Sequence, residues 1–245
     1  MIRNLKVLVA AALALAAVGA LSVPAAQAEP AKAKFHCAVA PCAITLAPDT
    51  SLTDPTTTHH VFVVKNSIGE SVSFTCDQLH GYATSSIATP TALLVTSLDY
   101  TTCKANGQAT VVRTNGCTYE IKAAGTVTIG CEAGKAIEVE ITGTGCIATV
   151  AAQGPLTGIS FANRGTKGQN PATTDVTVKA KVPGIKTTLD NAAGGKCLLD
   201  ETKTPITAEY TTGNTIAVGF NDPAGTPADK HGGTKVDVWW TTLGV

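Results

Sequence analysis

The stretch Leu98–Val150, LDYTTCKANGQATVVRTNGCTYEIKAAGTVTIGCEAGKAIEVEITGTGCIATV, decides the fold class of this chain. It carries four of the eight cysteines: Cys103, Cys117, Cys131 and Cys146. Asn-Gly dipeptides at 106–107 and 115–116 are strong turn signals, because both residue types tolerate a positive φ. Residues 136–141 alternate between apolar and polar side chains, as in a half-buried strand. The stretch therefore predicts a β-meander in which each cysteine pair brackets a strand–turn–strand segment.

The same alternation predicts strands along most of the remaining chain, and no amphipathic helix is expected after the N-terminal segment. Residues 77–91 fit no simple pattern. The expected fold is all-β: an antiparallel β-sandwich or a barrel-like meander of about a dozen short strands. Outside the central stretch, strands are expected at residues 43–47, 60–65, 70–76, 92–103, 158–163, 174–182, 185–189, 206–210, 215–220 and 235–242.

The first 28 residues have the features of a secretory signal peptide. Arg3 and Lys6 precede the apolar run 7–21, and residues 23–28 end in an Ala-x-Ala cleavage motif. A membrane anchor is the rival interpretation, but the run is short and Ala-rich, and no later stretch is long and apolar enough to cross a bilayer. We expect one secreted all-β domain over 29–245, with a subdivision near 150–165 left open.

Charge limits the class of partner. Removing residues 1–28 leaves 217 residues with 16 Lys/Arg and 18 Asp/Glu. A net charge near −2 without a basic block argues against nucleic acid and anionic lipid as partners. Sparse charge and abundant Thr, Ala, Gly and Val are typical of an extracellular β protein.

All eight cysteines lie in the exported part, so four disulfides are expected in an oxidising compartment. No Cys-x-x-Cys spacing occurs, which makes a zinc site a poor interpretation. Turn placement predicts the pairs Cys103–Cys117, Cys131–Cys146, Cys37–Cys42 and Cys76–Cys197.

No catalytic motif is present. The chain lacks a Gly-x-Ser-x-Gly elbow and a Gly-Asp-Ser-Gly loop, and its histidines are scattered. His59 and His60 should point to opposite faces of a strand and cannot chelate a metal together, so we interpret them as surface residues. Asp77 and His80 flank Cys76, but a disulfide there is expected over a nucleophile. We predict no enzyme, no cofactor and no metal site.

Other candidate sites are weaker still. The Asp-containing segments at 221–222 and 229 lack the spacing of a calcium loop, which favours solvated turns. Few aromatics are available for a sugar-binding face, and core packing is expected for the four tyrosines. These are Tyr82, Tyr100, Tyr119 and Tyr210.

The terminal segment Lys235–Thr242 alternates in a way that assigns its faces. Val236, Val238 and Trp240 share an apolar face that should pack inward. Trp239 shares the opposite, outer face with the charged residues Lys235 and Asp237. It is the candidate surface contact, because tryptophan concentrates binding energy at interfaces. The alternative is that Trp239 lies flat on a neighbouring strand.

Several segments resemble secreted, disulfide-containing β-rich proteins of high-GC Gram-positive bacteria: 98–103 (LDYTTC), 114–119 (TNGCTY), 125–131 (GTVTIGC) and 133–135 (AGK). The resemblance extends over about 72–197, and implies export and a β fold without catalytic residues. We expect a secreted or cell-envelope-associated binding or structural module. Its partner is unknown, with a cell-surface protein or a glycan as options. The alternative is a secreted hydrolase with a non-local catalytic site.

Overall fold

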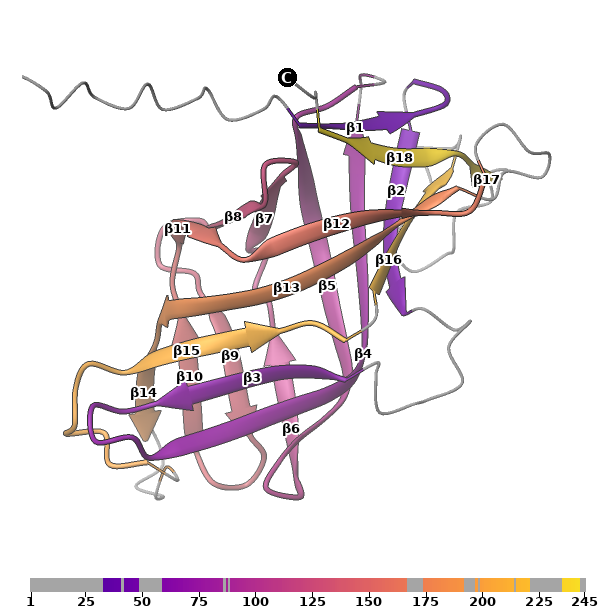
Figure 1. Cartoon of the computed structure of the whole chain (residues 1–245). Coiled ribbons are helices and arrows are strands. Elements are labelled where there is room, and N and C mark those ends of the chain that lie inside the picture. The colour runs from indigo at the N-terminus through magenta and orange to yellow at the C-terminus, as the bar shows by residue number, and fades with distance from the viewer. Residues whose placement is uncertain are drawn as a thin grey trace, which may run out of the picture. The chain divides into compact units, whose positions relative to one another are not determined.

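The structure is a computed structural model, and its described residues form strands, turns and loops without a helix (Figure 1). The predicted all-β class is therefore confirmed. Residues 32–245 form one compact unit. The predicted signal peptide, residues 1–28, lies outside the described residues, as do the segments around Asp222 and Asp229. The described residues are 33–40, 42–48, 59–85, 87, 89–166, 174–191, 197, 199–213, 215–220 and 235–242.

The strands are close to those expected, except that the unplaced segment 77–91 largely extends an existing strand. In chain order they are β1 Lys34–Cys37, β2 Cys42–Pro48, β3 His60–Lys65, β4 Ser71–Ser85, β5 Ala92–Ala105, β6 Gln108–Arg113, β7 Thr118–Lys122, β8 Thr126–Gly130, β9 Ile137–Ile141, β10 Cys146–Val150, β11 Gln153–Thr157, β12 Ile159–Arg164, β13 Asp175–Lys186, β14 Thr188–Asn191, β15 Thr207–Thr211, β16 Thr215–Phe220, β17 Lys235–Val236 and β18 Val238–Thr241.

Many of these strands continue one another end to end. Along β4, for example, β2 pairs with the second half of the strand and β3 with the first half. Along β5, β7 and β6 divide the opposite edge in the same way. We call each such line of strands a lane. In chain order the lanes are β2–β3, β4, β5, β6–β7, β8–β9, β10–β11–β12, β13–β14 and β15–β16.

Every lane pairs antiparallel with the next lane in the sequence. The sixth and seventh lanes, for instance, are joined through β10–β14 and β12–β13. The last lane returns to the first, because β15 pairs with β3 and β16 pairs with β2. This pairing closes the meander into an eight-lane antiparallel barrel, the second of the two architectures that the sequence allowed.

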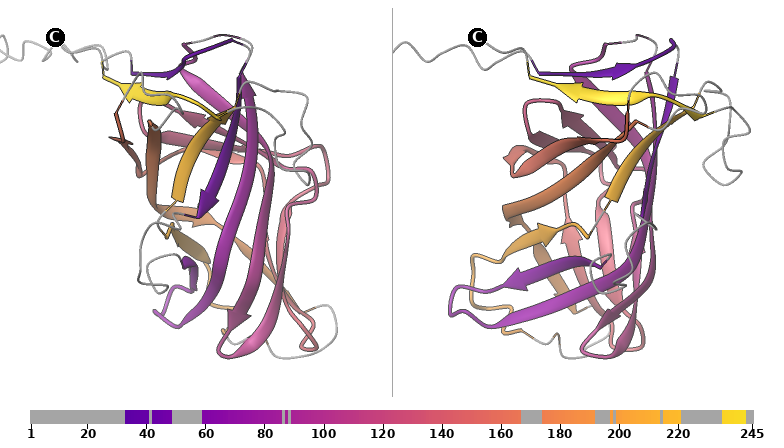
Figure 2. Two further views of the ribbon diagram at one scale, coloured as in Figure 1. Left: turned by 90° about the vertical axis from the view of Figure 1, so that its right-hand side faces the viewer. Right: turned by 45° about the vertical axis from the view of Figure 1, so that its right-hand side comes forward.

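A two-stranded sheet of β1 and β18 lies across one end of the barrel, where Figure 1 shows the first and last strands side by side. Phe35 of β1 is buried and meets the Phe161 ring edge to face, with 5.0 Å between ring centroids. Trp240 of β18 packs on Phe161 and donates its indole N–H to the Ala123 carbonyl at 3.0 Å. These contacts place apolar rings at that end of the barrel. Figure 2 shows the β1–β18 sheet across the same end from two further directions.

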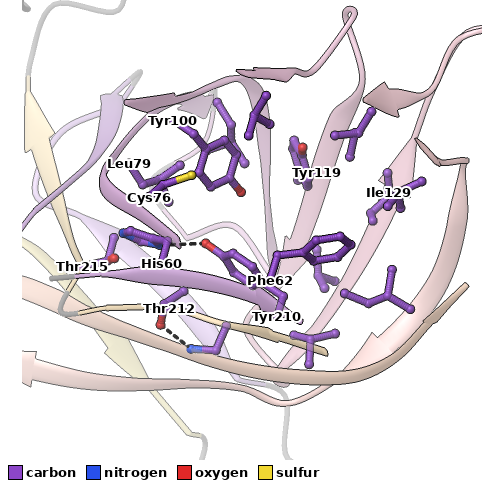
Figure 3. A pocket seen from close by; sticks show the side chains of 18 of the residues that line it. His60, Phe62, Cys76, Leu79, Tyr100, Tyr119, Ile129, Tyr210, Thr212 and Thr215 are labelled. Atoms are coloured by element: carbon purple, nitrogen blue, oxygen red, sulfur yellow. Dashed lines mark hydrogen bonds between the residues drawn. The ribbon is translucent and has the colours of Figure 1, made fainter. Parts of the chain in front are cut away.

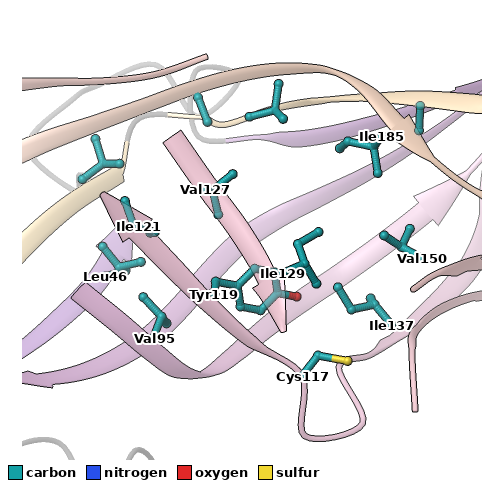
Figure 4. Packing of buried hydrophobic residues seen from close by; sticks show 14 of the residues in the cluster. Leu46, Val95, Cys117, Tyr119, Ile121, Val127, Ile129, Ile137, Val150 and Ile185 are labelled. Atoms are coloured by element: carbon teal, nitrogen blue, oxygen red, sulfur yellow. The ribbon is translucent and has the colours of Figure 1, made fainter. Parts of the chain in front are cut away.

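The opposite end is covered by the segment that precedes β15. The amide of Ser67 donates to the Lys203 carbonyl, and the amide of Asp200 donates to a Glu70 carboxylate oxygen, both at 3.1 Å. Leu199, within this segment, is buried and belongs to the apolar core cluster. Between the two covers, inward-facing apolar side chains from the lanes form one cluster, part of which Figure 4 shows.

Three disulfides are described, and they correct the predicted pairing. The bridges are Cys76–Cys103, Cys117–Cys131 and Cys146–Cys197, so the predicted pairs Cys103–Cys117, Cys131–Cys146 and Cys76–Cys197 are wrong. Cys37 is also disulfide-bonded. The side chain of its predicted partner Cys42 lies outside the described residues, so that pairing stays a prediction.

The physical reason for the correction is the register of the strands. Cys76 and Cys103 are direct cross-strand partners in the β4–β5 pair. Cys117 and Cys131 immediately flank the first and last residues of the β7–β8 hairpin, where Thr118 pairs with Gly130. Three disulfides in one compact unit indicate an oxidising compartment, as expected for an extracellular protein.

The described residues include no helix with the length and apolar character that a membrane crossing requires.

Candidate functional site

The barrel interior is not completely filled: it contains an apolar cavity of about 140 Å³. All eight lanes contribute side chains to its wall, and most are aliphatic or aromatic. Representative wall residues are Phe62 on β3, Leu79 on β4, Ile121 on β7, Val139 on β9 and Val182 on β13. Because every lane supplies the wall, the cavity is a property of barrel closure and not of any local motif.

Polar groups on the wall are few, and they gather where the split lanes meet end to end (Figure 3). His60 begins β3, Tyr210 is on β15, and Thr212 and Thr215 lie at the junction of β15 with β16. Tyr100 reaches the same region from β5. These groups make one side of the cavity polar. Tyr119 on β7 adds a further hydroxyl to the wall, and the remaining wall is mainly hydrocarbon.

His60 is the central polar residue of this group. Its side chain is buried, and its Nδ1 lies 2.8 Å from the Tyr210 hydroxyl. Figure 3 shows the ring between Tyr210 and Thr215. Among the described residues, Nε2 of His60 has no hydrogen-bond partner, although that atom is buried. A buried polar atom without a partner is costly, and in a native structure it often marks a site for a ligand or a water.

The site is electrically neutral at neutral pH. Burial, with a smaller contribution from the neighbouring His59, lowers the pKa of His60 to about 4. Burial raises the pKa of Tyr100 to about 12, with partial opposition from its hydrogen bond to Tyr210. Burial likewise raises the pKa values of Tyr210 and Tyr119 well above 10. The imidazole and the three phenols therefore remain uncharged.

The structure corrects one interpretation made from the sequence. His59 and His60 do point in opposite directions, as expected, but only His59 is a surface residue. His59 lies 3.4 Å from the Asp77 carboxylate, and both side chains are well exposed. His60 instead enters the interior, because its β3 position pairs with the inward-facing Cys76. The interpretation of His60 as a surface histidine is wrong.

Of the other sequence candidates, Cys76 also lines the cavity, but it is in a disulfide, as expected, and not a nucleophile. Among the described residues, no group of three or more His, Cys, Asp or Glu side chains could hold a metal ion. Of the four tyrosines, Tyr82 and Tyr119 are buried, in line with the expected core packing.

The terminal tryptophans lie in the β1–β18 cover. Val238 is buried, as expected, and Trp240 is half-buried against the core. Trp239 is also half-buried, and it stacks on the His36 ring with 5.1 Å between centroids and 3° between planes. This is the flat arrangement that the sequence left as the alternative. Its role as a surface contact stays a prediction.

Asp237 departs from the expected alternation. It was assigned to the outer face with Trp239, but it is buried and accepts a hydrogen bond from the Thr174 amide at 3.0 Å. Asp237 separates β17, which pairs with β16, from β18, which pairs with β1. The chain turns there from the barrel wall into the β1–β18 cover. The alternation of inward and outward side chains therefore does not continue through Asp237.

Comparison with known proteins gives no match to a family model, to a curated protein or to a solved structure. The geometry of the cavity therefore carries the functional argument.

Proposed function

We propose that this protein is a secreted, non-catalytic binding module that holds one small apolar molecule inside its barrel. The observation that carries the proposal is the cavity of about 140 Å³ that side chains from all eight lanes line. An eight-strand barrel is just wide enough to be filled by side chains or to hold one small ligand. Apolar cavities of roughly 150 Å³ remain dry and accept a molecule the size of benzene.

The chemistry of the wall supports a binder over a hydrolase. His60, the histidine inside the cavity, hydrogen-bonds to a phenol that is itself buried and un-ionised. A hydrolytic site needs a histidine that activates a nucleophile and is oriented by a carboxylate. The described wall residues include no Asp or Glu. An apolar wall also fits a small hydrophobic molecule better than a glycan, whose hydroxyls would lose their hydration.

The proposal is tested by thermal unfolding with benzene as the probe. At ten times the dissociation constant, benzene should stabilise the folded state by about 1.4 kcal/mol, raising Tm by a few degrees. The variant Ala180→Leu should remove this effect, because Ala180 lines the cavity and a larger side chain would occupy it. Ala162→Leu, the same change at an exposed position of β12, should respond like the wild type.

A soak of wild-type crystals in benzene locates the molecule independently of any variant. Density within the barrel supports the proposal. An unshifted Tm up to the solubility limit of benzene, together with an empty barrel in the soaked crystal, would refute it.

A further inference from the structure

One fully buried polar atom on the cavity wall has no hydrogen-bond partner among the described residues. Nε2 of His60 is buried and without a hydrogen-bond partner among the described residues, while the opposite ring nitrogen is engaged by Tyr210. His60 also lines the cavity. The neighbouring threonines are already engaged, since Thr212 accepts from the Ala180 amide at 2.8 Å and Thr215 donates to the Gly213 carbonyl at 3.4 Å.

The tautomer of His60 decides whether Nε2 donates a hydrogen bond to the ligand or accepts one from it. If Tyr210 donates to Nδ1, the proton of the neutral ring is on Nε2, which then is a donor. If Nδ1 donates to Tyr210, Nε2 carries a lone pair and is an acceptor. A hydroxyl group can complete either arrangement, because it donates and accepts. A carbonyl or an ether can complete only the first.

Charge restricts the ligand more strongly. The described wall residues include no Lys, Arg, Asp or Glu, and His60 is neutral at neutral pH. A carboxylate or an ammonium group would lose its hydration on entering this cavity without gaining an opposite charge, which is strongly unfavourable. The ligand must therefore be neutral. The volume limits it to about one aromatic ring or a short chain.

We propose that the cavity selects a small neutral molecule with one hydroxyl group, of the phenol class, whose hydroxyl hydrogen-bonds to Nε2 of His60. Its hydrocarbon part lies among the aliphatic side chains on the other side of the cavity, such as Val139 and Ile129. This inference rests on the proposed binding function and adds the ligand class and the residue that recognises it. His60 is here a specificity-determining residue.

The experiment compares phenol with toluene, which has nearly the same shape but a methyl group in place of the hydroxyl. The measured quantity is the ratio of the toluene to the phenol dissociation constant, determined by calorimetric titration. A hydrogen bond to a buried partner is worth roughly a tenfold change in affinity. We expect the ratio to fall by about tenfold or more in His60→Phe, which keeps a ring but removes both nitrogens.

The matched control is His59→Phe, the same substitution at the preceding, outward-facing position, which should keep the wild-type ratio. A second measurement needs no variant. In uniformly ¹⁵N-labelled wild-type protein, phenol should shift the Nε2 resonance of His60 by several ppm, and toluene should leave that resonance nearly unchanged.

The outcomes separate this inference from the proposed function. If toluene binds but the ratio is the same in His60→Phe and wild type and Nε2 does not respond to phenol, the hydroxyl preference is wrong and the binding function stands. If neither phenol nor toluene binds to the wild-type protein, both are wrong.

Discussion

Acidification offers a quantitative test of the interior position of His60. Its pKa is lowered to about 4 in the folded protein, whereas an unfolded chain should show about 6.5. Between these values the unfolded chain binds a proton at this residue and the folded protein does not. The free energy of unfolding therefore falls as the pH falls through this window. Above pH 6.5, His60 is neutral in both states and contributes no pH dependence.

The magnitude follows from the size of the shift. A difference of about 2.5 pKa units corresponds to about 3 kcal/mol lost between pH 7 and pH 4. Because His60 is almost fully buried, solvent screening should reduce this value little. For a protein of ordinary stability, this is a substantial part of the total.

The assay is urea unfolding at pH 7, 6, 5 and 4, in wild type and in His60→Phe. The wild type should lose about 3 kcal/mol more than the variant over this range, whatever the stability of the two proteins at pH 7. His59→Phe is the control and should retain the wild-type pH dependence. Parallel pH profiles for wild type and His60→Phe would show that His60 protonates normally in the folded state. The buried position would then be wrong.

Three further predictions concern the stability of the barrel. Gly158→Ala should lower the free energy of unfolding in urea by about 3 kcal/mol, because φ is +114° and a Cβ would lie 2.0 Å from the Lys181 carbonyl oxygen. Gly184→Ala is the control: φ is also positive, but the space around it is open, and the cost should be about 1 kcal/mol. Trp240→Ala should lower stability by about 3 kcal/mol and Trp239→Ala by about 1 kcal/mol, and a larger loss at Trp239 in thermal melts would contradict the packing described for β18. Excess reductant should lower Tm by many degrees, because each described bridge is worth about 3–4 kcal/mol in the chain-entropy model, and an unchanged melting curve would show that the core suffices alone.

Part of the disulfide pairing could have been predicted from the register of the strands. The two-residue turn at 106–107 pairs Ala105 with Gln108, and therefore Cys103 with Thr110. Cys117 follows the next turn, at 114–116, and the strand after it pairs with the far half of β5, where Tyr119 lies opposite Val95. Val95 is eight residues from Cys103, about 26 Å at 3.3 Å per residue. A disulfide needs Cα atoms within roughly 7 Å, so register alone excludes Cys103–Cys117.

Counting residues outward from a turn predicts one disulfide correctly. A hairpin with its turn at 123–125 pairs Lys122 with Thr126, and that register places Cys117 opposite Cys131. The Cys76–Cys103 bridge could not be obtained in this way. It depends on where β4 ends and β5 begins, and residues 77–91 carry no alternation that fixes this connection.

The position of His60 depends on the register of the β3–β4 hairpin. The strands expected at 60–65 and 70–76 leave a turn at 66–69, which would pair Lys65 with Glu70 and His60 with Thr75. In the structure the loop is one residue longer, so that Lys65 pairs with Ser71 and His60 with Cys76. Residues paired directly across antiparallel strands share a face. The one-residue difference in loop length therefore decides which face His60 takes, and the expected turn places it on the wrong face.

The cavity itself could not be predicted, because it depends on all eight lanes at once. Each wall position, such as Val112 or Ala180, is an ordinary inward-facing residue in its own strand. Only closure of the last lane onto the first sets the distance across the barrel, and no local pattern encodes the β15–β3 and β16–β2 pairings.

Composition then explains why this barrel remains partly empty. An eight-strand barrel has an interior that side chains can fill, but filling depends on their volume. Only 4% of this chain is aromatic. Five Phe and Tyr side chains line the cavity, but the rest of the wall is built mainly from Val, Ile and Leu. Unfilled volume in a core costs stability, since the wall loses packing contacts. A core with few aromatic residues depends more on its disulfides. In the closed barrel, the same scarcity leaves space for a ligand, and the cross-links stabilise walls that the core alone packs incompletely.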